Sequence, residues 1–190
     1  EAQHTSIASL ADDVFFVTFG GLSKNYRVAG FRSGWLVVSG NKRLASDYID
    51  GLNILSSMRM CANVPCQSAI QTALGGYQSI NDLVNENGRL RIQRDVTTDM
   101  LNGIDGISCV KPKGAMYCFA KVDEKKFNIH NDEQMVLDLL SSEKILLVHG
   151  RAFNLTEGTY FRLVFLPHSD VLVPALHRIG NFFRTYKQGA

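Results

Sequence analysis

Short apolar runs alternate along this chain with longer segments of helical periodicity, and this alternation limits the fold more than any other feature. VFFVTF at 14–19 and GWLVVSG at 34–40 are two such runs, each ending at or just before a glycine. Continuous runs of this kind are typical of strands buried on both faces, as in a parallel sheet. Further strands are predicted on either side of Pro112 and Gly114, at ILLVHG (145–150) and at YFRLVFLP (160–167).

The segments between these runs predict helices. One starts at Lys42, and a later one, over 131–143, has Asn131 as its expected N-cap and acids in its first turn. Because strands and helices alternate, the predicted fold class is α/β. Other helices are expected at 66–77, 88–101 and 171–186, the last capped by Ser169 and Asp170. The residues expected to form the core face of the first helix are Leu44, Tyr48, Leu52 and Leu55.

The longest polar stretch, NENG at 85–88, is the predicted seam between two units. A chain of 190 residues can hold one large domain or two small ones. We therefore expect one domain over 1–86 and a second over 87–190.

Composition excludes several classes of protein. The net charge is only +2 and the sequence has no block of Lys and Arg, which argues against a nucleic-acid binder that works by bulk electrostatics. No apolar run is long enough to span a membrane, and no signal peptide is visible. A small anionic ligand held by a few placed cations fits this charge balance.

Cysteine and histidine spacing predicts no metal site. The four cysteines contain no CxxC pair, and the five histidines have no ligand spacing. We interpret the cysteines, Cys61 among them, as buried thiols of a reducing, cytoplasmic compartment, and Met60 as a core residue. His149 ends a predicted strand, where a structural role is favoured over lining a pocket.

Lys24 follows the apolar run 14–19 and the glycine pair Gly20-Gly21. One reading is a solvated lysine in a turn. A phosphate-binding P-loop is excluded because it needs glycine before the lysine and a hydroxyl after it, whereas Ser23 precedes and Asn25 follows. The third reading is a Schiff-base lysine, whose pKa of about 10.4 is lowered by burial and neighbouring cations.

Arg32 stands eight positions after Lys24. A guanidinium can bind two oxygens of a phosphate and stays charged at any working pH. A lysine for an aldehyde, with an arginine and Ser23 for a phosphate, describes a pocket for pyridoxal 5'-phosphate.

The stretch SKNYRVAGFRSGW resembles the lysine signature of class I and II aminotransferases, enzymes of fold type I that use pyridoxal phosphate. In that signature the Schiff-base lysine precedes the phosphate-binding arginine, which lies inside a G-x-R-x-G-[WY] pattern. Lys24 and Arg32 match these two positions, with Gly30, Gly34 and Trp35 in register. Ser23 is a further candidate phosphate contact, at a position whose residue type varies in the family.

The resemblance covers essentially the whole chain. SMRMCANVPCQSAIQTALGGYQSI is similar to bacterial alanine (glutamate–pyruvate) aminotransferases, and KPKGAMYCF, ILLVHGRAFN and YFRLVFLP follow in the order of that family's small-domain landmarks. It implies the end of the three-layer α/β/α large domain, followed by the small α/β domain.

Arg162 stands inside the apolar run YFRLVFLP. A charge there is costly unless it is paired, so one interpretation is that the guanidinium of Arg162 reaches solvent at the end of the strand. The resemblance implies another role, in which Arg162 binds the α-carboxylate of an amino-acid substrate.

The resemblance implies transamination, with Lys24 as Schiff base and general base, between an L-amino acid, expected to be alanine, and 2-oxoglutarate. It also implies a homodimer. Family members bind the cofactor ring through residues that lie well before the lysine, and Asp12 and Asp13 do not match the position of the family's acid. The chain is therefore expected to be a C-terminal fragment with weak or no activity, and full activity of the isolated chain would contradict this.

Two other functions stay open. Another enzyme of fold type I, such as a C–S lyase or an acyl-CoA-dependent synthase, would use the same Lys24 and Arg32. An aminotransferase-like domain could instead be the ligand sensor of a transcriptional regulator.

Overall fold

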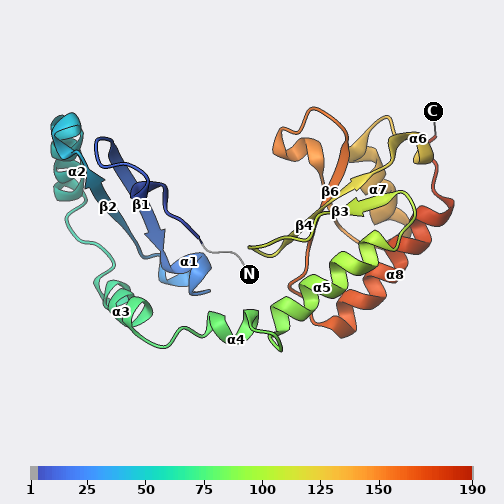
Figure 1. The fold of residues 1–190 in the computed structure, drawn as a ribbon, viewed down its shortest axis with the longest axis horizontal. Helices are drawn as coiled ribbons and strands as arrows, with labels where there is room; N and C mark the ends of the chain where they lie inside the picture. Colours follow the sequence, from blue (N-terminus) through green and yellow to red (C-terminus); the bar gives the residue numbers. More distant parts are fainter. Residues whose placement is uncertain (1–3, 190) are drawn as a thin grey trace. The chain divides into compact units, whose positions relative to one another are not determined.

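The computed structural model describes residues 4–189 of the chain. Contacts within it divide the chain into two compact units, Glu1–Ile80 and Asn81–Ala190, called here the first and second unit (Figure 1). The division falls after the first residue of the short helix α4 (Ile80–Val84), slightly before the seam expected from the sequence. The assignment of 1–86 and 87–190 to a large and a small domain stays a prediction.

The first unit contains a two-stranded antiparallel sheet of β1 (Phe15–Gly21) and β2 (Gly34–Gly40). The sequence correctly predicts both strands, but the parallel arrangement expected for the first one is wrong. An apolar run indicates that a strand forms and not which way its neighbour points, and here the connecting loop turns the chain back on itself. The other elements of this unit are η1 (Ile7–Ser9), α1 (Leu22–Asn25), η2 (Ala29–Phe31), η3 (Lys42–Ala45), α2 (Ser46–Arg59) and α3 (Val64–Gly75).

Burial in the first unit differs from the sequence-based expectation. Among its described residues, Leu22 is the only hydrophobic side chain that is fully buried. Leu44, Tyr48 and Leu55 were expected to face a core, yet all three are exposed. Met60, expected in the core, is 84% exposed. Helical spacing identifies an apolar face but not what covers it. Cys61 is exposed as well, contrary to its interpretation as a buried thiol.

The second unit is built on a four-stranded antiparallel sheet in the order β3-β4-β6-β5. Three helices pack on one face of this sheet and enclose the core (Figure 1). The strands are β3 (Ile107–Cys109), β4 (Tyr117–Val122), β5 (Val148–His149) and β6 (Thr159–Val164), and the helices are α5 (Arg89–Asn102), α7 (Asp132–Glu143) and α8 (Ser169–Thr185), with the short helix α6 (Glu124–Phe127) between β4 and α7.

Strand alternation separates two faces of this sheet. On β6, Phe161 and Leu163 are buried in the core, whereas Tyr160 and Arg162 are only partly buried. Residues two apart on a strand share a face, so Tyr160 and Arg162 lie on the side opposite the helices. Phe119 of β4 pairs directly with Arg162, which brings an aromatic residue beside the arginine on that side.

Two details of the second unit test the predicted helix caps. The side chain of Asn131 accepts hydrogen bonds from the backbone N–H groups of Glu133 (2.9 Å) and Gln134 (3.2 Å), which confirms it as the N-cap of α7. The predicted cap of α8 is wrong, because Ser169 already lies inside the helix and His168 is its N-cap.

The strand expected over 145–150 is shorter in the structure, where β5 contains only Val148–His149.

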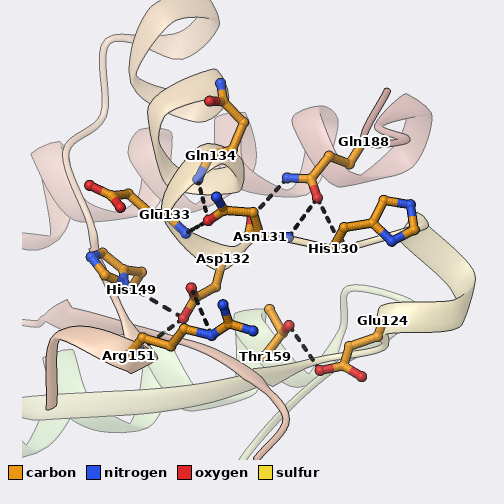
Figure 2. A network of polar contacts seen from close by, with 10 residues as sticks. All are labelled: Glu124, His130, Asn131, Asp132, Glu133, Gln134, His149, Arg151, Thr159 and Gln188. Atoms are coloured by element: carbon orange, nitrogen blue, oxygen red, sulfur yellow. Dashed lines mark hydrogen bonds and ion pairs between the residues drawn. The ribbon is translucent and has the colours of Figure 1, made fainter. Parts of the chain in front are cut away.

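The chain's C-terminal segment is tied to the second unit through Gln188, which is 5% exposed. Its side-chain oxygen accepts the backbone N–H groups of His130 (2.6 Å) and Asn131 (2.9 Å), and its side-chain nitrogen donates to the carbonyl of Asn131 (2.7 Å; Figure 2). One side chain thus satisfies three backbone groups just before α7.

We expect Gln188→Ala to lower the free energy of unfolding by about 2 kcal/mol, because it leaves three partly buried backbone groups without their partner. Urea denaturation of the whole chain, followed by circular dichroism, measures this loss. Gln134→Ala is the matched control, since Gln134 is exposed and its side chain makes one bond, to Asp138 (2.7 Å). Equal losses in the two variants would contradict the role assigned to Gln188.

Candidate functional site

The loop between β1 and β2 carries all three residues predicted to bind the cofactor, Ser23, Lys24 and Arg32. Its ends are joined by a hydrogen bond from the backbone N–H of Leu22 to the carbonyl of Ser33 (3.1 Å). Lys24 comes two residues after Leu22, in α1, and Arg32 comes directly before Ser33. The closed loop therefore brings the backbones of Lys24 and Arg32 into one small region.

Glycines let the two strands approach closely at the base of this loop. A Cβ atom on Gly20 would lie 2.2 Å from Cε2 of Trp35, so the tryptophan ring occupies the space of a side chain there. A Cβ atom on Gly34 would lie 2.7 Å from the carbonyl oxygen of Gly20. A larger residue at Gly20 would require the Trp35 ring to move, and a larger residue at Gly34 would require a shift of the backbone.

Two arginines of the loop have left-handed backbone conformations, Arg27 with φ 59° and Arg32 with φ 50°. Each such residue costs about 1 kcal/mol relative to the right-handed region. Side-chain bonds help to hold them: the guanidinium of Arg32 donates to the carbonyl of Ala29 (2.8 Å), and that of Arg27 donates to the hydroxyl of Ser79 (2.7 Å). Backbone strain of this kind is concentrated at functional sites.

Two of the three predicted site side chains in this loop are open to solvent. Lys24 and Arg32 are exposed and Ser23 is half-buried. The burial that the sequence predicts for Lys24 is therefore not found in this chain, because no described element of the first unit covers α1 on that side. An exposed amine and an exposed guanidinium, with a half-buried hydroxyl on the same loop, can bind an anionic ligand that carries a reactive carbonyl.

Arg162 occupies a different environment, on the open face of the sheet in the second unit. Its guanidinium carbon lies 4.6 Å from the ring centroid of Tyr117 and 4.6 Å from that of Phe153. The Nε atom is buried and has no hydrogen-bond partner within the described residues. A planar cation held between two rings with an unsatisfied donor is suited to bind a carboxylate.

Tyr117 and Phe153 were not identified as site residues from the sequence. Tyr117 lies two residues before Phe119 on β4, and alternation could have assigned both to the face of Arg162 once the strand pairing was known. Phe153 lies in η4 (Gly150–Phe153), and no sequence pattern links this turn to β6. Lys24 and Arg32 belong to the first unit and Arg162 to the second.

Other classes of site are not found in the part of the chain that the structure describes. Among residues 4–189, no group of three or more His, Cys, Asp or Glu side chains could hold a metal ion. Within the same residues, no helix has the length and apolar character needed to cross a membrane.

The family model and two similar proteins found by comparison are all aminotransferases. The family model "Aminotransferase class I and II" matches residues 1–179. The glutamate-pyruvate aminotransferase AlaA of Haemophilus influenzae is 56% identical over 187 residues, which are 98% of this chain and 46% of that protein. The alanine aminotransferase of Mycobacterium bovis is 53% identical over 188 residues, which are 99% of this chain and 44% of that protein.

Solved structures agree with this family. The crystal structure of an aminotransferase from Escherichia coli matches with a TM-score of 0.93 at 54% identity, over 100% of this chain and 47% of the other. The alanine aminotransferase from Pyrococcus furiosus matches with a TM-score of 0.87 at 33% identity, over 97% of this chain and 46% of the other. The chain thus spans about half the length of the relatives it matches.

The predicted fold class, α/β and part of an aminotransferase of fold type I, is confirmed by these likenesses. The match to the family model covers both units and includes Lys24, Arg32 and Arg162. The chain therefore belongs to the class I and II aminotransferase family.

Proposed function

We propose that the protein containing this chain is a pyridoxal-phosphate-dependent aminotransferase that moves an amino group from L-alanine to 2-oxoglutarate. The observation that carries the proposal is the closed loop on which Lys24 and Arg32 stand together, in a chain of this family. The names of two similar proteins, a glutamate-pyruvate aminotransferase and an alanine aminotransferase, support the choice of substrates. We also propose that the protein is cytoplasmic and acts as a homodimer.

The residues of the loop fit the cofactor. Lys24 offers a primary amine for the aldehyde, and Arg32 offers a guanidinium for the phosphate, with the hydroxyl of Ser23 as a second phosphate contact. When bound, pyridoxal phosphate supplies an electron sink for the bonds at the substrate α-carbon. Lys24 then accepts the proton of that carbon on its Nζ atom as general base.

Arg162 fits the carboxylate that both substrates share. The unsatisfied Nε atom of this residue supports a bidentate bond to the two carboxylate oxygens, and the rings of Tyr117 and Phe153 contact the guanidinium group. The same bidentate bond can bind the amino acid and the 2-oxo acid, because each carries a carboxylate next to the reacting carbon.

We expect Lys24→Ala to lower the rate of transamination of the full-length protein by a factor of about 1,000, because the general base is lost. Coupled assays for pyruvate and glutamate measure the rate. After borohydride reduction, peptide mass spectrometry should find a phosphopyridoxyl group on Lys24 of the unaltered protein. Lys42→Ala, which removes another exposed lysine, is the control and should retain activity.

The same assay separates the alternatives. With cysteine in place of alanine, release of sulfide, ammonia and pyruvate without glutamate would support a C–S lyase instead. Binding of amino acid without any product would support a ligand sensor. A phosphopyridoxyl group on another lysine would contradict the role of Lys24.

We expect Arg32→Met to weaken pyridoxal phosphate binding by about 10- to 100-fold, because charge-assisted bonds to the phosphate are lost. Fluorescence titration of the apoprotein with the cofactor gives the dissociation constant. Arg27→Met is the matched control, since Arg27 lies in the same loop with a left-handed backbone as well. If both variants bind equally weakly, Arg32 acts through the shape of the loop and not through its charge.

We expect Arg162→Lys to raise the KM for alanine and for 2-oxoglutarate together, by about tenfold or more, because lysine keeps the charge but not the planar fork. Affinity for pyridoxal phosphate should not change. Arg178→Lys in α8 is the control, since Arg178 pairs with Glu143 (3.1 Å). A rise in the KM of one substrate alone would argue against binding of the shared carboxylate.

A further inference from the structure

Asp132 is a carboxylate buried at the first turn of α7, with a side chain that is 2% exposed. One of its oxygens, Oδ2, accepts the backbone N–H of Arg151 (2.9 Å) and lies 3.6 Å from Nδ1 of His149. The other, Oδ1, lies 3.6 Å from Nε of Arg151 and has no hydrogen bond within the described residues. Figure 2 shows the three side chains converging between α7 and the segment that follows β5.

All these contacts fall on one short segment. His149 is the last residue of β5, and Arg151 lies in the turn η4, which runs from Gly150 to Phe153. The residue after the turn, Asn154, is its C-cap, a left-handed residue whose backbone N–H donates to the carbonyl of Arg151 (3.0 Å). Asp132 therefore holds the start of a turn whose last residue is Phe153.

The position of this turn decides where the ring of Phe153 lies. The ring is 4.6 Å from the guanidinium carbon of Arg162 and contacts Phe119 edge-on at 5.8 Å. The turn is also packed tightly against β6, since a Cβ atom on Gly150 would lie 3.1 Å from Cβ of Tyr160. Asp132 and this packing fix the turn from two sides.

The energetics favour a specific role for the acid. A buried carboxylate is costly to desolvate unless it is paired and hydrogen-bonded, and the partial positive charge at the start of α7 offsets only part of that cost. Asn131 already caps the helix, so Asp132 is not needed as the cap. What remains for Asp132 is to hold the backbone of η4.

We propose that Asp132 is a positioning residue for carboxylate recognition, which holds η4 so that Phe153 keeps the guanidinium of Arg162 aligned against Tyr117. The inference rests on the proposed function of Arg162. Its first test does not require catalysis, so that the two proposals can fail separately.

The first test is the NMR resonance of the Arg162 Nε–H group in the 190-residue chain, assigned through its loss in Arg162→Lys. Between two aromatic faces this proton should be shifted upfield. Asp132→Ala should move the resonance toward its position in Phe153→Leu. Asp132→Asn should leave it in place, because the amide oxygen still accepts the N–H of Arg151. Glu133→Ala, an exposed neighbour in the same helical turn, is the control.

The second test is kinetic and uses the full-length protein. Asp132→Ala and Phe153→Leu should each raise the KM for alanine and 2-oxoglutarate by about tenfold, with unchanged affinity for pyridoxal phosphate. The double variant should be no worse than Phe153→Leu alone, because both changes act on the same ring.

Several results would overturn the proposal. An unmoved Arg162 resonance in Asp132→Ala, or additive effects in the double variant, would leave Asp132 as a structural residue only. If Asp132→Ala does not fold, the KM of Phe153→Leu for alanine and 2-oxoglutarate is the deciding measurement. An unchanged KM in that variant would show that the turn does not affect Arg162 and would overturn the proposal. Absence of transamination in the unaltered protein would refute the proposed function, whereas the resonance would still test the role of Asp132.

Discussion

Pairing between β4 and β6 organises the second unit, because it aligns two strands whose side chains alternate between a packed face and an open one. Phe161 and Leu163 join the core beneath the helices, and Arg162 between them must therefore point to the other side. A shift of one residue in this register would bury the guanidinium and expose the core residues. The same pairing that stabilises the fold thus also determines which side of the sheet can bind a ligand.

The loop of the first unit reflects a comparable constraint. Gly20 and Gly34 allow the strands to meet closely, and the bond between Leu22 and Ser33 closes the loop that carries Lys24 and Arg32. The left-handed arginines are less stable than helical or extended residues would be at these positions. Hydrophobic stabilisation lies mainly in the second unit, whose core draws on both the sheet and its helices. Most buried hydrophobic residues therefore lie in the second unit, whereas Lys24 and Arg32 lie in the first unit, which has little buried apolar surface.

Local patterns predicted much of this organisation. Apolar runs located β1, β2, β4 and β6, helical spacing located the long helices, and Asn131 was recognised as a cap because its side chain satisfies groups only two and three residues away. The spacing of Lys24 and Arg32 also pointed to a common ligand, since both lie within one short connection. These features depend on neighbours in the chain, so the residue order is sufficient to predict them.

Features that depend on distant segments could not be obtained in this way. The direction of β1 relative to β2, the exposure of Lys24 and the aromatic partners of Arg162 each depend on which surfaces meet in space. Phe153 lies beside Arg162 on a turn that is held by Asp132 of α7 and by the packing of Gly150 against Tyr160. Residue order alone determined the local elements and, through the resemblance of one motif to a known signature, the family and its candidate charges. Long-range packing determined how Arg162 is held, because contacts between remote segments leave no periodic signal in the sequence.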